Sequence, residues 1–359
     1  MTRGLRGAPV VLLVALLVAG GASIAWAPRV DAQAAPATPP AGTIGGVLRA
    51  ADPALPLDGT RVEVVGVDAA GGIVTFEGLS TGARFAIEVP ADPQTTYLVR
   101  AFVEDVPYFA PTAVLLSPEL PSAEVAIEVF SVTNEAPALR IASTTVTMLA
   151  LDRAAAQMTF VREDVVVNPS LKTYVATHGP TVRLPLPDGT VLADGTAAYL
   201  GIPVPGAFVI DGATLNTGAA IRPGETSLVS QLVVGYDREA DAYRLRLTPS
   251  LRTDGIEVLV PERFVGRVEP AAEAVRAENR SIEGETLIDI VSTGALEPGR
   301  SLLVDLEGLS GARPPSPLTA FPGAAIGLAL VLAVIAAGAH LASGWSSRRA
   351  GRRPDTEGA

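Results

Sequence analysis

Apolar residues are arranged in two ways along this chain: in long runs near both ends, and in alternation with polar residues between them. The first run extends from about Ala8 to Ala27, and the second extends from Phe321 to Leu341. About 20 consecutive apolar residues are enough to cross the hydrocarbon core of a bilayer as a helix. The pattern therefore predicts two membrane-directed ends around a long middle section that lies in water.

The N-terminal run is typical of a secretory signal. Two arginines precede an apolar h-region at Val10–Ala19, and small residues follow it. Cleavage after Ala32 or Ala34 fits a small-x-small site, so residues 1–34 are predicted to be a signal peptide. The alternative is an uncleaved anchor, because the whole apolar run is almost long enough to span a bilayer.

The C-terminal run predicts a transmembrane helix over residues 321–342, followed by an arginine-rich tail over 343–359. Trp345 stands where an interfacial aromatic residue is expected. The positive-inside rule places the tail in the cytoplasm, on the strength of Arg348, Arg349, Arg352 and Arg353. A single-pass protein of the cytoplasmic (inner) membrane is expected, with its bulk on the extracytoplasmic, periplasmic side.

Gly323 and Gly327 form a GxxxG pattern inside the predicted span. Such a pattern lets two helices approach closely, which would give a homodimer through the transmembrane helix. An Ala/Gly-rich helix without a partner explains the same residues. Both interpretations remain open at the level of sequence.

Short segments with a period of two begin after a Pro-rich leader at residues 35–42. Apolar and polar residues alternate in Arg61–Val64, Arg84–Val89, Tyr97–Glu104 and Val125–Val129. This spacing places one face of each strand in a core and the other in water. Strands this short, separated by Gly-, Asp- and Pro-rich turns, indicate a β-sandwich.

Four motifs in this part of the chain occur in a familiar order. They are Thr43-Ile44-Gly45-Gly46-Val47, Gly59-Thr60-Arg61-Val62-Glu63-Val64, Gly78-Leu79-Ser80 and Thr96-Tyr97-Leu98-Val99. Together they resemble the carboxypeptidase regulatory-like, or prealbumin-like, β-sandwich over residues 43–130. The family's Asp-x-x-Gly-x-Phe turn is degraded here to Asp68–Ile73. The resemblance implies a non-catalytic accessory module and carries over no active-site residues.

A second β-rich region is predicted over residues 131–310, and a second sandwich of Ig-like type is its simplest interpretation. The strand candidates are 141–151, 157–167, 181–186, 227–236, 242–248, 256–260, 286–292 and 301–306. A short helical turn is expected at Ala271–Ala277. A proline-rich stalk follows at 311–320. The predicted fold class is thus an all-β ectodomain of two tandem sandwiches, with a signal helix and a C-terminal transmembrane helix. The whole arrangement resembles bacterial membrane-anchored envelope proteins.

The composition of the chain excludes several kinds of partner and functional site. The net charge of −11 argues against nucleic acid as a partner. The chain has no cysteine, which excludes disulfides, thiolate metal sites and cysteine nucleophiles. No cofactor and no metal ion is expected.

Three patterns could carry catalysis or metal binding, and each has a plainer explanation. Ser80 lies in a G-x-S-x-G match, but the segment after it alternates like a strand instead of a helix. His178, the one histidine of the ectodomain, stands in a turn. The carboxylates Glu163-Asp164 and Asp237–Asp241 lack regular calcium-loop spacing, and a solvated hairpin tip explains the second group.

A binding face is the remaining candidate site. Phe102, Tyr108 and Phe109 are close together in the sequence, and Phe102 falls on the polar side of its strand. Exposed aromatic rings would suit sugar or peptide stacking. Alternatively, Phe102 packs against the second domain or another sheet.

The sequence therefore favours a non-catalytic, membrane-anchored scaffold or accessory subunit that binds another envelope protein. A carbohydrate- or surface-polymer-binding module is the alternative. A hydrolase is the third hypothesis, and it would have to rely on carboxylates alone.

Overall fold

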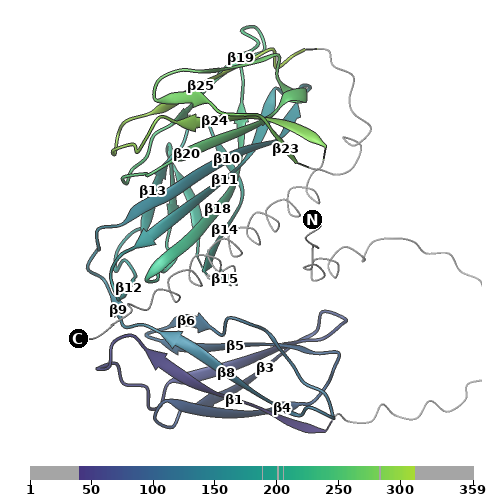
Figure 1. Ribbon diagram of the computed structural model, residues 1–359, viewed down its shortest axis with the longest axis vertical. Helices are drawn as coiled ribbons and strands as arrows, with labels where there is room; N and C mark the ends of the chain where they lie inside the picture. The colour runs from purple at the N-terminus through teal and green to yellow at the C-terminus, as the bar shows by residue number, and fades with distance from the viewer. Residues whose placement is uncertain (1–39, 188, 200–201, 205, 283, 312–359) are drawn as a thin grey trace, which may run out of the picture. The chain divides into compact units, whose positions relative to one another are not determined.

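The computed structural model describes residues 40–311, apart from 188, 200–201, 205 and 283 (Figure 1). The regular secondary structure of these residues consists of strands and one 3-10 helix, η1 (Glu262–Phe264). The predicted all-β class is confirmed. From Pro40 onward the described residues belong to one compact unit.

The two predicted membrane-directed ends lie outside the described residues. These include the signal peptide at 1–34 and the segments after 311: the stalk, the span at 321–342 and the tail. Within the described part of the chain, no helix has the length and apolar character needed to cross a bilayer. The predicted leader overlaps the first strand, which begins at Ala41.

Two sheets make up the first 90 described residues. One has the order β4-β1-β8 and the other β3-β2-β5-β6, with the short β7 also paired to β5 (Figure 1). The β1–β8 pair is parallel and the other pairs are antiparallel. The strands are β1 (Ala41–Ala50), β2 (Arg61–Val67), β3 (Ile73–Leu79), β4 (Arg84–Pro90), β5 (Thr96–Val103), β6 (Val106–Phe109), β7 (Val114–Leu115) and β8 (Ser122–Val129).

Alternation along the strands builds a single core between these two sheets. On β4 the residues Phe85, Ile87 and Val89 are buried, whereas Arg84 and Glu88 are exposed. The same period-two pattern recurs on β2, β5 and β8, and their inward residues belong to one apolar cluster. The arrangement is sandwich-like, because each sheet buries one face against the other.

A nine-stranded sheet dominates the rest of the molecule (Figure 1). Its order is β15-β14-β18-β11-β10-β20-β24-β22, with β23 also paired to β24. These strands are β10 (Arg140–Asp152), β11 (Gln157–Asn168), β14 (Val191–Tyr199), β15 (Ile202–Val204), β18 (Gly224–Gly235), β20 (Ile256–Pro261), β22 (Ala274–Arg276), β23 (Arg280–Ile282) and β24 (Glu285–Ser292).

Two smaller sheets complete this region, and they contribute to two different cores. The sheet β13-β17-β16 shares an apolar cluster with Ile141, Val166 and Leu228, and the sheet β19-β25-β21 shares another with Met148 and Phe160. The strands are β13 (Val182–Pro185), β16 (Phe208–Asp211), β17 (Thr214–Thr217), β19 (Ala242–Leu247), β21 (Arg267–Pro270) and β25 (Leu302–Glu307). One long sheet therefore carries two cores side by side.

A buried ion pair separates these two cores. On β11 the buried side chains run from Phe160 through Arg162 and Asp164 to Val166. Arg162 Nε donates to Asp164 Oδ2 at 2.8 Å, and Thr144 Oγ1 on β10 donates to Asp164 Oδ1 at 2.7 Å. The guanidinium also donates to the carbonyl of Pro185 on β13. The charges are thus satisfied within the protein.

The two regions meet through short strands and two buried polar side chains. Strands β9 (Val132–Thr133) and β12 (Thr173–Tyr174) pair in parallel. Tyr108 Oη donates to Thr173 Oγ1 at 2.7 Å, and Arg222 donates to the carbonyl of Pro107. Burial lowers the pKa of Arg222, although two tyrosine rings, Tyr108 and Tyr199, lie within cation–π distance of its guanidinium.

Each of the eight strands predicted in the second region matches an observed strand within a few residues, whereas the other nine described strands there were not predicted. One prediction is wrong: Ala271–Ala277 contains β22 and no helical turn. Ala274 is buried, and β22 pairs with β24 from Ala274↔Ser292 to Arg276↔Ile290. The ladder to β24 overrides the local helix propensity of an Ala/Glu-rich segment.

Candidate interaction surface

Strand β3 is the edge of its sheet and is exposed along nearly its whole length. Ile73, Val74 and Leu79 are exposed to 73%, 47% and 66%, although all three are large aliphatic residues. Phe76 alone among the apolar side chains of β3 packs against the core. A long, flat, apolar edge strand is a ready template for pairing with another chain.

The turn between β2 and β3 determines which residues of β3 face outward. Asp68 Oδ1 accepts hydrogen bonds from the backbone N–H groups of Ala70 and Gly72, and Gly71 adopts a φ of +82°. This turn sets the register of β2 against β3, from Val67↔Ile73 to Arg61↔Leu79. Odd-numbered residues of β3 consequently face outward.

The edge strand of the opposite sheet is built differently. On β4 the exposed side chains are Arg84, Ala86 and Glu88, and the strand ends at Pro90. Charges and proline are the devices by which natural sheets discourage pairing at an edge. Of these devices β3 carries one, the carboxylate of Glu77.

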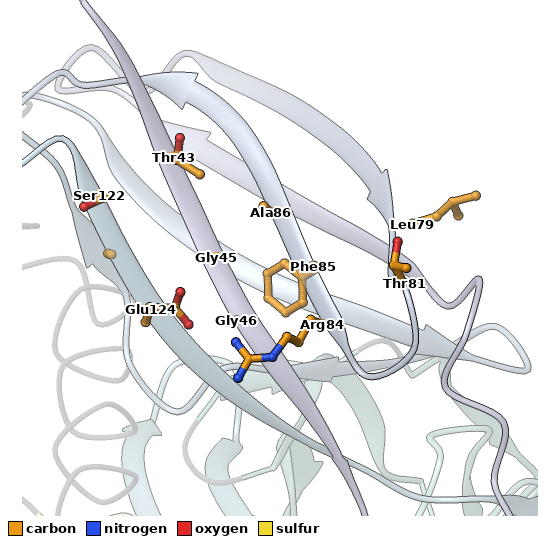
Figure 2. A pocket seen from close by; sticks show the side chains of 11 residues that line it. Thr43, Gly45, Gly46, Leu79, Thr81, Arg84, Phe85, Ala86, Ser122 and Glu124 are labelled. Atoms are coloured by element: carbon orange, nitrogen blue, oxygen red, sulfur yellow. The ribbon is translucent and has the colours of Figure 1, made fainter.

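A groove of about 600 Å³ lies beside this edge, on the outer face of the β4-β1-β8 sheet. Its floor is made of small residues, including Gly45 and Ala86, and Leu79 at the end of β3 lines one side. Figure 2 shows the side chain of Arg84 extending across β1 near Gly46, toward the side on which Glu124 lies. The groove therefore offers one cationic and one anionic group above a flat floor.

Phe102, the first residue of the predicted binding face, lies on the outer side of β5 and is half-buried. The guanidinium carbons of Arg61 and Arg100 are 3.9 Å and 5.1 Å from its ring centroid. Both arginines also pair with the buried carboxylate of Glu63, at 3.2 Å and 2.6 Å. A sugar ring stacking on Phe102 would have to displace these cations.

The other two aromatic residues of the predicted face point elsewhere. Tyr108 is buried on the inner side of β6, and burial raises its pKa to about 12. Phe109 is half-buried and packs against the core that contains Ile141 and Val166. The three rings therefore do not form one exposed aromatic face.

Ser80 has a structural partner on each side. It is buried, its Oγ donates to the carbonyl of Leu57, and it accepts from the backbone N–H of Thr60 at 2.9 Å. Strand β4 follows it, so the G-x-S-x-G match lacks the strand-turn-helix geometry of a nucleophile elbow.

The acidic clusters also make structural contacts. Glu163 accepts from Ser227 Oγ at 2.6 Å, and Asp237 accepts from the backbone of Glu239 at 2.8 Å. His178 is exposed in the segment between β12 and β13. Within the described ranges, no three or more histidine, aspartate and glutamate side chains converge to hold a metal ion.

The membrane-directed residues cannot be placed beside this surface. Trp345, the four arginines of the tail, and the glycines of the GxxxG pattern lie outside the described residues. The β3 edge itself was missed by the sequence analysis. Ile73-Val74-Thr75-Phe76 is a run of strand-forming residues between glycines, which is the available signal, although nothing local shows that it is left uncovered.

Comparisons with known proteins add little. No protein family and no curated protein matches the chain. Among solved structures, the M1 zinc metallopeptidase of Deinococcus radiodurans matches 47% of this chain and 42% of its own, with a TM-score of 0.31 and 12% identity. A two-domain M1 zinc metallopeptidase with bound L-tryptophan gives a TM-score of 0.31 and 12% identity, over 47% and 43%. The chain spans less than half the length of these proteins, and so distant a likeness carries no conclusion about activity.

Proposed function

We propose that this protein is a non-catalytic scaffold or accessory subunit of the bacterial envelope, anchored in the cytoplasmic membrane by its C-terminal span. In this proposal the ectodomain consists of a prealbumin-like sandwich domain and a second β domain, in which one long sheet carries two cores. It binds other protein chains through the open β3 edge of the first domain. No cofactor takes part.

The exposure of β3 is the observation that carries the proposal. Single exposed aliphatic residues are normal on a protein surface, but here three occupy one edge strand. Strand addition at such an edge gives affinity through main-chain hydrogen bonds and specificity through alternate side chains. Glycan binding has less support, because guanidinium groups already lie close to Phe102.

Photocrosslinking in the native membrane tests the binding surface. A photoreactive amino acid replaces Leu79, or, in a matched control, Leu171, which is exposed to 68% on the loop before β12. We expect a protein adduct from position 79 and none from position 171. Equal adducts at both positions, or none at 79, would contradict the proposal.

Fractionation tests the anchor separately. A chain that ends at Gly311 lacks the predicted span and should be released from membranes by lysis, while the full chain stays in the membrane fraction through an alkaline wash. Release of the full chain by that wash would exclude a transmembrane anchor, whatever the outcome at β3.

A further inference from the structure

The sequence of β3 is complementary to itself. In an antiparallel pair of two β3 strands centred on Phe76, Ile73 lies opposite Leu79 and Thr75 lies opposite Glu77. Both pairs occur twice, because the arrangement has a two-fold axis. Directly opposed side chains are the unit of sheet stabilisation, and here aliphatic meets aliphatic while the carboxylate meets a hydroxyl donor.

Neighbouring registers lack this match. A shift of the centre to Thr75 places Ile73 opposite the carboxylate of Glu77. A shift to Glu77, like a parallel pair in register, places the two carboxylates opposite each other, which is destabilising. A shift by a single position would turn outward-facing residues against inward-facing ones. The sequence thus selects one register.

The inward face fits the same register. Phe76 lies opposite its own copy, and Val74 lies opposite Gly78. A Cβ at Gly78 would stand 3.0 Å from Cγ1 of Ile87, which favours a glycine opposite Val74. Val74, exposed to 47%, would be covered by the incoming strand.

Charge on this edge also favours a second copy over an unrelated acidic or basic segment. Within the seven residues of β3 the only charge is Glu77, and its opposite residue on β2 is Glu63, whose carboxylate is neutralised by Arg61 and Arg100. The edge is therefore neither cationic nor strongly anionic. A mainly aliphatic strand with a single charge is the chemistry it fits, and β3 is such a strand.

We propose that two copies of this chain pair through their β3 strands, antiparallel and centred on Phe76, so that the sheets join as β6-β5-β2-β3-β3-β2-β5-β6. The proposal rests on the proposed function of β3 as a protein-binding surface and names its occupant. The dimer displays two copies of the groove beside Leu79.

Cysteine crosslinking of the full chain in membranes tests the register, because the chain has no cysteine of its own. Opposed residues of an antiparallel pair have Cα atoms about 4.5–5.5 Å apart, within the reach of a disulfide. Phe76→Cys should therefore give a disulfide-linked dimer on mild oxidation. Ile73→Cys should give none alone, since residue 73 and its copy would lie about 20 Å apart.

Two differently tagged chains provide the version of the test that leaves the core intact. Co-expressed Ile73→Cys and Leu79→Cys chains should form a mixed dimer with both tags, whereas neither forms a dimer of its own. Both residues are exposed, so neither change disturbs packing. Leu115→Cys, exposed to 66% on β7, is the control and should stay monomeric when oxidised. Adding Thr75→Glu to both chains of the mixed pair places a second carboxylate opposite each Glu77 and should abolish the mixed band.

The outcomes separate this inference from the proposed function. A mixed 73–79 dimer supports the second copy in the stated register. Dimers of equal yield from all positions, or no mixed dimer, overturn it. If the photoreactive residue at 79 then captures a different protein, the binding surface stands and its occupant is not a second copy; if it captures nothing, both proposals fail.

Discussion

Folded proteins usually bury aliphatic side chains and expose charged ones, and strands β3 and β11 each depart from one half of this rule. On β3 aliphatic side chains lie in water, and on β11 the charged pair Arg162 and Asp164 is 3% and 0% exposed. The buried pair has its partners within the fold: each other, Thr144 and the carbonyl of Pro185. Among the described strands, the exposed strand has one hydrogen-bonded neighbour, β2, and its other edge is unpaired.

The difference indicates that the buried ion pair of β11 affects folding, whereas the exposed residues of β3 affect association with another chain. A buried charge costs several kcal/mol unless the protein itself satisfies it, so the residues around β11 must act together. An exposed aliphatic residue costs the folded chain little relative to the unfolded one, since both leave it in water. Substitutions on β11 should therefore change stability, and substitutions on β3 should change association.

The largest effect is expected from Asp164→Ala. Removal of the carboxylate leaves Arg162 buried without its counter-charge, which should lower the free energy of unfolding by about 3–5 kcal/mol. Denaturant unfolding of the full chain in detergent, followed by circular dichroism of the strands, measures the loss.

Replacement of both partners provides the control for that experiment. In Arg162→Met with Asp164→Leu no buried charge remains, so most of the lost stability should return. A double variant as unstable as Asp164→Ala would show that the volume of the pair matters more than its charge. A loss below about 1 kcal/mol in the single variant would contradict the contrast with β3.

A second buried polar group, Tyr108, should make stability depend on alkaline pH. Its pKa is raised to about 12 from the ordinary value near 10, first by burial. Between these values the native state holds the proton and the unfolded state releases it, so stability is full below pH 10 and falls as the pH rises toward 12. The fall amounts to at most about 3 kcal/mol.

Melting temperatures across this pH range test the assignment. Tyr108→Phe cannot titrate and should show a shallower decline than the parent. The decline should not vanish, because burial also raises the pKa values of Tyr97 and Tyr199. Identical slopes in the two proteins would remove Tyr108 as a titrating group.

Ser80 places a smaller buried polar contact directly after β3. Ser80→Ala removes the donor to Leu57 and the acceptor of the Thr60 N–H, which should cost about 1–3 kcal/mol. Thr81→Ala is the matched control one residue along, at an exposed position, and should cost less. Equal losses would mean that the turn, and not the Ser80 hydroxyl, carries the stability.

Sequence patterns predicted the parts of this molecule whose determinants are local. Alternation over 157–167 predicted the bounds of β11 almost to the residue, because a strand with one buried face has an inward-facing residue at every second position. Residues 191–217 form four strands, although their sequence shows no strong alternation of apolar and polar residues. Ala271–Ala277 contains strand β22 because it pairs with β24. Long-range pairing decides such elements.

The candidate surface could be predicted only in part for the same reason. The strand propensity of Ile73–Phe76 is visible in the sequence, but its position at an edge depends on the order β3-β2-β5-β6. Phe102, Tyr108 and Phe109 are neighbours in sequence, yet they face arginines, a core and a second core respectively. Proximity in the sequence does not show which part of the fold packs against each of these side chains.

The smallest effect on folding, and the most direct test of the contrast, is expected from Ile73→Lys with Leu79→Lys. Both positions are exposed, so the free energy of unfolding should change by less than about 0.5 kcal/mol. Lysine on an edge strand opposes pairing with another chain, so the variant should lose association through β3. Sedimentation of the full chain in detergent measures association, and unfolding curves measure the free energy of unfolding.

A control with the same added charge, Leu120→Lys with Leu171→Lys, uses exposed leucines away from β3 and should keep the association of the parent. If instead the β3 variant unfolded as readily as Asp164→Ala, the aliphatic residues of β3 would belong to the fold, and the distinction between the two strands would fail.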